Sequence, residues 1–300
     1  MGKKVGRFRG PDGRAAYIRA YRAAVATLPT PSDSFDVRTS LGSVHGYRWT
    51  GADSEAVPVA LIPGRSAGAP MWADNLASIL RAGRTVYVMD AVGDAGLSEQ
   101  SAPLTAFADQ AIWIEEAFQR LGVDRVHTVG HSFGAATAAV HAVHHPERVA
   151  TLALLEPAFV LRRPPAATFL WATLAIIGPK SWREHALAKI GGVDVADVRA
   201  RTPVGEMISA GAQHYDSSGL PTPRPLSRTH LERLTMPVYV AIAGDRSLAG
   251  GERAAARART LADATVDVWP STTHSLPMQV PEELALRLRS FWDRSSPVTR

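Results

Sequence analysis

Residues 126–136 read VHTVGHSFGAA, and this stretch decides the fold expected for the chain. Its first part is rich in β-branched residues and predicts a buried strand, whereas the alanine-rich part after Phe133 predicts a helix. Between them lies a G-x-S-x-G turn, from Gly130 to Gly134, with Ser132 at its centre. A sharp turn between a strand and a helix holds a serine hydroxyl exposed beside a base, as a nucleophile requires. The alternative is an ordinary glycine-rich turn in which Ser132 caps the helix.

The composition is that of a globular protein with one large domain. Of the 300 residues, 46% are hydrophobic and 20% are charged, which allows a sizeable core. The chain has no cysteine, which excludes disulfides, thiolate metal sites and a cysteine nucleophile. No apolar segment follows the basic start, and the longest apolar run, Phe169–Ile177, is too short to span a bilayer. We therefore expect a soluble cytoplasmic protein without a membrane span.

The formal net charge of +5 is concentrated at the N-terminus. Residues 1–22 contain seven Lys and Arg residues against Asp12 alone, so the rest of the chain is nearly neutral. A nucleic-acid surface requires a basic stripe across the fold. We therefore expect a solvated basic arm and no nucleic-acid partner. Within this arm, apolar residues at helical spacing from Tyr17 to Leu28 predict a helix that Pro29 and Pro31 stop.

Strand and helix patterns alternate from residue 57 onward, after two runs of antiparallel type at residues 35–39 and 43–49. The expected strands are Val57–Ile62, Thr85–Met89, Arg125–Gly130, Val149–Leu155, Pro237–Ala243 and Thr265–Trp269. The expected helices are Met71–Leu80, Leu104–Leu121, Phe133–His144, Glu252–Leu261 and Pro281–Trp292. This alternation, with unbroken apolar strands, predicts an α/β fold with a mostly parallel central sheet flanked by helices. Chemistry in such sheets lies at the carboxyl ends of the strands.

The alternation is interrupted at residues 161–234, where we find helical patterns, prolines at both ends and no strand pattern. A long excursion that leaves a sheet and rejoins it is best interpreted as a cap over the strand ends. The expected organisation is a basic N-terminal arm and helix at 1–34, a core at 35–160 and 235–300, and a helical cap at 161–234.

A base for Ser132 is predicted from chain position. His274 follows the last expected strand and precedes the last expected helix, so its loop lies at the same sheet edge as Ser132. His131 lies inside the turn and is expected to point to the wrong face. A further cluster lies on the next helix but contains no carboxylate, so we expect a solvated helix end and no metal site; it comprises His141, His144 and His145.

Across residues 35–295, in the order nucleophile, acid, histidine, the chain resembles the α/β-hydrolase fold family. Residues 90–98, DAVGDAGLS, match that family's D-x-x-G-x-G-x-S loop, and together with the arm they resemble a bacterial carboxylesterase-like branch. The family fold carries a helical cap inserted after the sixth strand, which is where residues 161–234 stand.

Residues 63–72, PGRSAGAPMW, resemble the oxyanion loop of the family, with Pro63 at a position that usually holds His. The resemblance implies that the backbone N–H groups of Arg65 and Phe133 stabilise the oxyanion. Because these donors belong to the backbone, the change to Pro63 need not abolish the hole.

The acid departs from the usual family pattern. Most members carry it after the seventh strand as G-x-x-D, but here residues 243–248 read AGDRSL, with Ser247 at that position and Asp245 two residues earlier. Haloalkane dehalogenases carry the acid after the sixth strand, where this chain has Glu156. A carboxylate that ends an apolar strand needs a partner, and the N–H of His274 is a suitable one. We therefore prefer Glu156, with Asp245 as the alternative acid; without that role, Glu156 caps the next segment and Asp245 is a turn residue.

Together these residues predict a serine hydrolase that needs no cofactor. Ser132 attacks a carboxylic ester, or a related lactone or thioester, with His274 as base and Glu156 orienting it, and water releases the acyl group. An apolar portion of this small-molecule substrate is expected to contact aromatic residues. The alternative for those of the cap is that they form its own core. These candidate pocket residues are Trp72, Phe169, Trp171 and Trp182.

A serine at the elbow excludes the dehalogenase and epoxide-hydrolase reactions, which use an aspartate there. It does not separate a carboxylesterase from a lactonase, thioesterase, carbon–carbon hydrolase or cofactor-free haloperoxidase. A different class of protein, a catalytically weak or silent ligand-binding protein on a hydrolase scaffold, is favoured by Ser247 and Pro63. The intact set of Ser132, His274 and Glu156 argues against it.

Overall fold

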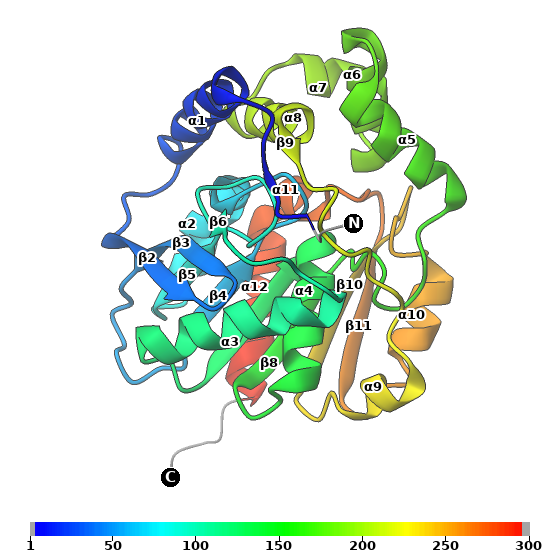
Figure 1. Ribbon diagram of the computed structural model, residues 1–300. Helices are drawn as coiled ribbons and strands as arrows, with labels where there is room; N and C mark the ends of the chain where they lie inside the picture. Colours follow the sequence, from blue (N-terminus) through cyan, green and yellow to red (C-terminus); the bar gives the residue numbers. More distant parts are fainter. Residues whose placement is uncertain (1–3, 296–300) are drawn as a thin grey trace.

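The computed structural model describes residues 4–295, which form a central twisted sheet with helices on both faces (Figure 1). A second group of helices stands apart from the sheet, at the top of the view. The sheet has nine strands in the spatial order β11-β10-β8-β7-β4-β5-β3-β2, with β6 paired to β3. They are β2 (Asp33–Thr39), β3 (Gly42–Trp49), β4 (Val59–Ile62), β5 (Val86–Met89), β6 (Glu99–Gln100), β7 (Val126–His131), β8 (Val149–Leu155), β10 (Val238–Ala243) and β11 (Ala264–Trp269).

The sheet is parallel from β11 to β5, and its antiparallel part is the end formed by β3, β2 and β6. The central strands β7 and β8 are buried along their whole length, as the β-branched residues of β7 and the largely apolar sequence of β8 predict. The expectation of a mostly parallel sheet flanked by helices is therefore confirmed. The carboxyl ends of β7, β8, β10 and β11 meet at one edge, which is where the candidate site lies.

Two apolar clusters cover the two faces of the sheet. One contains residues of α3, α4 and α10, and the other contains residues of α2 and α12 together with the arm helix. The helices of the core, with two short 3₁₀ segments, are η1 (Ala69–Trp72), α2 (Ala73–Leu80), η2 (Phe107–Asp109), α3 (Gln110–Leu121), α4 (Phe133–His144), α10 (Glu252–Ala258), α11 (Leu276–Gln279) and α12 (Pro281–Ser295).

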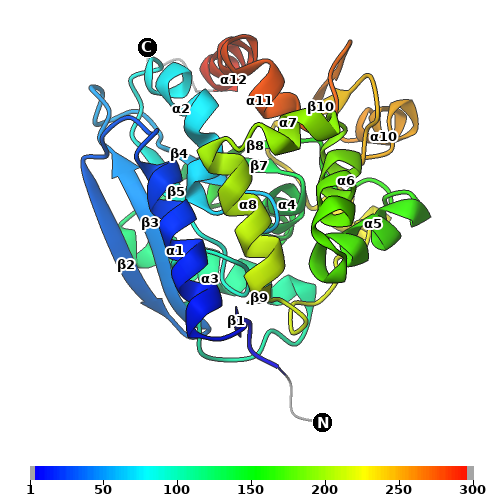
Figure 2. The same ribbon diagram turned by 90° about the horizontal axis from the view of Figure 1, so that it is seen from above.

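The N-terminal arm packs against the cap as well as the core. Helix α1 (Pro11–Val25) lies along the last long helix of the cap, α8 (Pro203–His214), as Figure 2 shows. Strand β1 (Arg7–Phe8) pairs antiparallel with β9 (Tyr215–Asp216). The expectation that residues 161–234 contain no strand is therefore wrong at β9, because its pairing partner lies about two hundred residues away in the arm and leaves no local pattern.

The cap consists of helices and rejoins the core through β9 and a long irregular segment. Its helices are α5 (Ala166–Ile177), α6 (Lys180–Gly191), α7 (Val195–Arg199) and α8. Helix α9 (Arg228–Glu232) lies at the other end of the sheet (Figure 1), and Leu226 and Leu234 on either side of it belong to a core cluster. The expectation that the cap extends to residue 234 is therefore wrong, because the chain returns to the core before α9. Within residues 4–295, no helix combines the length and the apolar character that crossing a bilayer requires.

Candidate active site

The turn between β7 and α4 holds Ser132 in a strained conformation. Its φ of 55° and ψ of −116° lie where residues other than glycine are rare. The two glycines of the motif are required because backbone carbonyl oxygens approach them too closely to leave room for a side chain. A Cβ on Gly130 would collide with the carbonyl oxygen of Gly134, and one on Gly134 would collide with those of Ile62 and Pro63. The motif therefore packs α4 directly onto the end of β4 and leaves the Ser132 side chain half-buried at the sheet edge.

The structure brings Ser132, His274 and Glu156 together from three separate segments. His274 Nε2 lies 2.8 Å from Ser132 Oγ, and His274 Nδ1 lies 3.0 Å from Glu156 Oε2. His274 is 5% exposed and Glu156 is 0% exposed, so the second contact is shielded from water. A serine hydroxyl, an imidazole and a carboxylate in this order form the arrangement in which a serine loses its proton to a base.

Glu156 lies in a cradle of hydrogen-bond donors. Oε1 accepts from the Ala243 amide at 2.8 Å and from Ser247 Oγ at 2.7 Å, and Oε2 accepts from the Leu248 amide at 2.9 Å. Burial by itself raises the pKa of Glu156, but His274, Ser247 and the Ala243 amide outweigh it and hold that pKa below its usual value. The carboxylate is therefore ionised at neutral pH and able to stabilise an imidazolium.

Asp245, the alternative acid, is not part of this cluster. Its side chain is exposed, and its backbone amide donates to the Thr272 carbonyl oxygen at 2.8 Å. Ser247, at the position where the family usually has its acid, instead donates its hydroxyl to Glu156. The geometry thus favours Glu156 over Asp245 as the partner of His274, and it gives Ser247 a role that the sequence did not reveal.

The two backbone amides expected to form the oxyanion hole lie on different segments, that of Arg65 in the loop after β4 and that of Phe133 at the start of α4. Neither the Arg65 amide nor the Phe133 amide donates a hydrogen bond within the part of the chain that the structure describes. Gly64 lies beside the nucleophile, since a Cβ built on it would be 3.5 Å from the Cβ of Ser132. The loop is held in place by the next amide, Ser66 N–H, which donates to Asp94 Oδ2 at 2.8 Å.

Two buried carboxylates, Asp94 and Asp90, brace this loop, and sequence reasoning did not identify their role. Asp94 accepts from the amides of Ser66 and Ala95, while Asp90 accepts from the amide of Ala69 at 2.6 Å and from the hydroxyl of Tyr21 at 3.0 Å. Burial raises the pKa of both carboxyls, and these hydrogen bonds act in the opposite direction. Two acidic residues inside an otherwise apolar loop were the signal that could have revealed them.

His131 has a structural role that the sequence did not predict. Its Nε2 lies 2.9 Å from the backbone carbonyl oxygen of His274, and the two imidazole rings lie 5.0 Å apart. Burial lowers the pKa of His131 to about 3, so the ring is neutral and its Nε2–H donates to that carbonyl. His131 therefore helps to position the loop that carries the base.

The expectation that the histidine cluster on α4 forms a solvated helix end is wrong for His141. That side chain is fully buried, and its Nε2 lies 3.2 Å from Glu115 Oε2 on α3. Arg148 completes the group by donating to Glu115 Oε1 at 2.6 Å. The expectation failed because the carboxylate comes from another helix, which the local pattern does not show. Among residues 4–295, no group of three potential ligands is arranged to hold a metal ion.

The aromatic residues expected in the substrate pocket lie in different environments. Trp72 is 0% exposed in the core beneath the oxyanion loop, so it presents no surface to a substrate, which corrects its assignment. Phe169 and Trp182 on the cap are 47% and 58% exposed. Trp171 and Trp182 line an open hollow of about 430 Å³ between α5 and α6 whose lining includes no residue of the triad.

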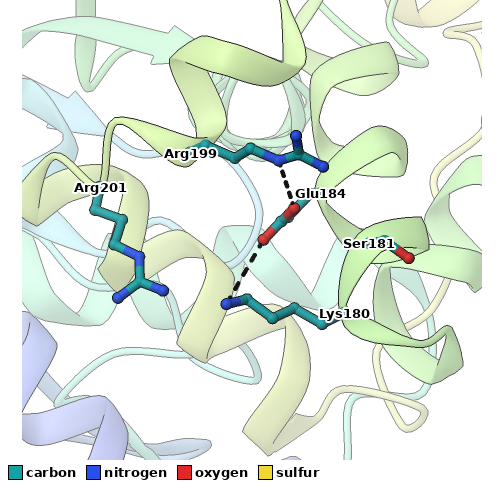
Figure 3. A pocket seen from close by; sticks show the side chains of 5 residues that line it. All are labelled: Lys180, Ser181, Glu184, Arg199 and Arg201. Carbon is teal, nitrogen blue, oxygen red and sulfur yellow. Dashed lines mark hydrogen bonds and ion pairs between the residues drawn. The ribbon is translucent and has the colours of Figure 1, made fainter.

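A second hollow of the cap, of about 580 Å³, is strongly basic (Figure 3). Glu184 lies at its centre, where it accepts from Arg199 Nε at 2.8 Å and faces Lys180 Nζ at 4.0 Å. Arg201 lines the hollow without an ion pair among the described residues. No triad residue lines this hollow either, so its charges are separate from the reacting centre.

Comparison with known proteins agrees with this architecture. The family described as alpha/beta hydrolase fold matches residues 57–191. Carboxylesterase YbfK of Bacillus subtilis (strain 168) is 25% identical over 293 residues, which cover 95% of this chain and 96% of that protein. An uncharacterized carboxylesterase, nap, of the same organism is 29% identical over 147 residues, covering 49% of this chain and 48% of that protein.

Solved structures give the same result over nearly the whole chain. Naproxen esterase (carboxylesterase NP) from Bacillus subtilis superposes with a TM-score of 0.86 at 22% identity, covering 95% of this chain and 99% of that one. Carboxylesterase CesB (YbfK) from Bacillus subtilis has a TM-score of 0.84 at 22% identity, covering 94% and 98%. The chain therefore has the α/β-hydrolase fold, and the resemblance noted from its motifs is confirmed at that level.

Proposed function

We propose that this chain, which has the α/β-hydrolase fold, is a serine carboxylesterase that cleaves small-molecule esters through an acyl-enzyme. The observation that carries the proposal is the continuous relay of contacts from Ser132 Oγ through both nitrogens of His274 to Glu156. The relatives named carboxylesterases, one of which matches almost the whole chain, support it independently.

In the proposed reaction, Ser132 Oγ attacks the ester carbonyl carbon while its proton passes to His274 Nε2. Glu156 keeps the Nδ1–H of His274 in place and stabilises the imidazolium that forms. The amides of Arg65 and Phe133 donate to the oxygen that becomes negative, and each such donor contributes about 10²–10³ in rate. His274 then gives the proton to the departing alkoxide, which leaves as an alcohol.

The second half of the reaction reverses the proton path. Water attacks the acyl-enzyme while His274 takes its proton, and the proton returns to Ser132 as the carboxylic acid leaves. Two carbon–oxygen bonds are broken and two are formed over the cycle, with no change of oxidation state. No cofactor is required by this sequence of steps.

Hydrolysis of p-nitrophenyl butyrate and labelling by a fluorophosphonate probe test the proposal. We expect turnover and stoichiometric labelling by the unmodified protein, and loss of both in Ser132→Ala. Ser54, an exposed loop serine, offers a matched control, since Ser54→Ala should retain both signals. Absence of turnover and of labelling in the unmodified protein would remove the enzyme hypothesis and favour a silent ligand-binding protein.

The ester class is separated from its neighbours by the choice of acyl compound. A panel of esters, lactones and thioesters with the same acyl chain distinguishes a carboxylesterase from a lactonase or a thioesterase by kcat/KM. We expect the open-chain esters to give the highest values.

From the sequence alone, Ser247 favoured a catalytically silent protein. Its hydroxyl donates a hydrogen bond to Glu156, and this contact supports turnover.

A further inference from the structure

We infer that the side chain of Arg65 selects esters that carry a carboxylate in addition to the scissile ester group. The inference rests on the proposed esterase function and concerns the guanidinium of Arg65, whereas the oxyanion hole would use only its backbone amide. Esters of this kind are half-esters of dicarboxylic acids or esters of hydroxy acids.

The guanidinium of Arg65 lies between the nucleophile turn and the cap. Its central carbon lies 5.3 Å from the ring centroid of Phe133, the residue directly after Ser132. Its Nη2–H donates to Ser217 Oγ at 2.7 Å, in the cap segment that follows β9. The residue before it, Gly64, packs on Ser132 itself. A positive charge is thus held between Phe133, which follows the nucleophile, and Ser217 of the cap.

This charge has no direct ion-pair partner within the described residues. Arg65 is exposed, and among residues 4–295 it makes no ion pair and has one hydrogen-bonded partner, the uncharged Ser217. Asp94 attracts it electrostatically, but both Asp94 oxygens already accept from the backbone amides of Ser66 and Ala95. Asp216, beside Ser217, accepts from the Ser218 amide and is drawn toward the arm cations Arg9 and Lys4.

A guanidinium has five N–H donors in a planar fork, and Arg65 uses one of them. A residue that only linked the cap to the core would need no charge, because the uncharged amide side chain of a glutamine can also donate a hydrogen bond to Ser217. A planar fork with free donors matches the two oxygens of a carboxylate. The ring of Phe133 beneath it gives the fork a fixed orientation through a cation–π contact.

The test compares matched pairs of esters that differ only in charge. One pair carries the charge in the acyl part, p-nitrophenyl hemiadipate against p-nitrophenyl adipamate. The other carries it in the alcohol part, p-carboxyphenyl butyrate against p-carbamoylphenyl butyrate. The quantity measured is the ratio of kcat/KM for the anionic ester to that for its neutral amide, because this ratio cancels any general loss of activity.

We expect the ratio for at least one pair to fall about 10- to 100-fold in Arg65→Gln, the usual range for a lost charge-assisted hydrogen bond. Arg65→Lys, which keeps the charge but loses the fork, should fall less, and high salt should reduce the ratio of the unmodified protein. Arg201→Gln removes an unpaired arginine of the basic cap hollow and should leave the ratios unchanged.

Two outcomes overturn the inference. If Arg65→Gln and Ser217→Ala lower kcat/KM for all four esters by one common factor, Arg65 only links the cap to the core and does not select the substrate. If Arg201→Gln shifts the ratios as much as Arg65→Gln, the preference reflects the general charge of the cap. A protein that cleaves none of the esters and is not labelled at Ser132 contradicts the esterase proposal instead, so the two failures are distinguishable.

Discussion

Replacing Glu156 by glutamine tests the proposed triad most directly. The substitution keeps the size of the side chain but exchanges one acceptor oxygen for an N–H₂ donor. Every group around the carboxylate in the described structure is a donor: Ala243 N–H, Ser247 Oγ–H, Leu248 N–H, Ala249 N–H and His274 Nδ1–H. The N–H₂ group of a glutamine at this position therefore faces at least one other hydrogen-bond donor, with which it cannot form a hydrogen bond.

The magnitude follows from where the new N–H₂ group lies. On the Oε2 side it faces His274 and forces Nδ1 to become an acceptor, which puts the remaining proton on Nε2, toward Ser132. This wrong tautomer costs about 10⁴ in kcat. On the Oε1 side Ser247 can turn to accept, but the Ala243 amide is left unpaired, at a cost of about 1–3 kcal/mol in stability. In either orientation the imidazolium loses its counter-charge.

The assay is kcat for p-nitrophenyl butyrate, with the midpoint of urea unfolding measured on the same samples. We expect Glu156→Gln to lower kcat by about 10⁴, while Asp245→Asn, which changes an exposed carboxylate outside the cluster, alters kcat little. A Glu156→Gln protein within tenfold of the unmodified one, or a collapse of kcat in Asp245→Asn, would refute the reasoning.

Two further predictions concern groups outside the triad. Asp94→Ala frees the Ser66 amide and loosens the oxyanion loop, so kcat should fall by about 10² while KM changes little. An equal fall in Glu55→Ala, which removes an exposed carboxylate from a loop, would contradict this. Glu115→Gln removes the negative charge that faces Arg148 and leaves one acceptor oxygen in place of two, and it should cost about 3 kcal/mol in urea unfolding. Burial raises the pKa of Glu115, but His141 and Arg148 outweigh it and depress that pKa. Its contribution to stability is therefore complete above the ordinary carboxyl pKa of about 4.3 and declines as the pH falls below it. A Glu115→Gln protein that loses stability toward acid as steeply as the unmodified one would contradict this assignment.

Several features followed from the sequence because their causes are local. The β-branched residues of β7 and the glycines around Ser132 specify a buried strand and a tight turn without reference to distant residues. Chain order then places His274 at the same sheet edge, since the carboxyl ends of parallel strands lie together. Alternation along the chain was likewise sufficient to predict the layers of the core.

Other features depend on contacts between residues far apart in the chain. The arm helix ends at Val25, and its residue Tyr21 reaches the buried carboxylate of Asp90, 69 positions away. Trp72 follows the oxyanion loop and was expected to face a substrate, yet it completes the core on the α2 side of the sheet. His131 bonds to the loop of the base, 143 positions away. None of these partners can be recognised from the local sequence pattern.

The acid shows most clearly what each level determines. By itself the sequence determined that a carboxylate ends the apolar strand β8, and the cost of burying it unpaired made a partner necessary. Whether Glu156 or Asp245 faces His274 was decided by the tertiary structure alone. The donors that hold Glu156 come from β10 and its loop, between 87 and 93 positions further along the chain. A carboxylate takes its role from the donors around it, and only the folded chain assembles those donors.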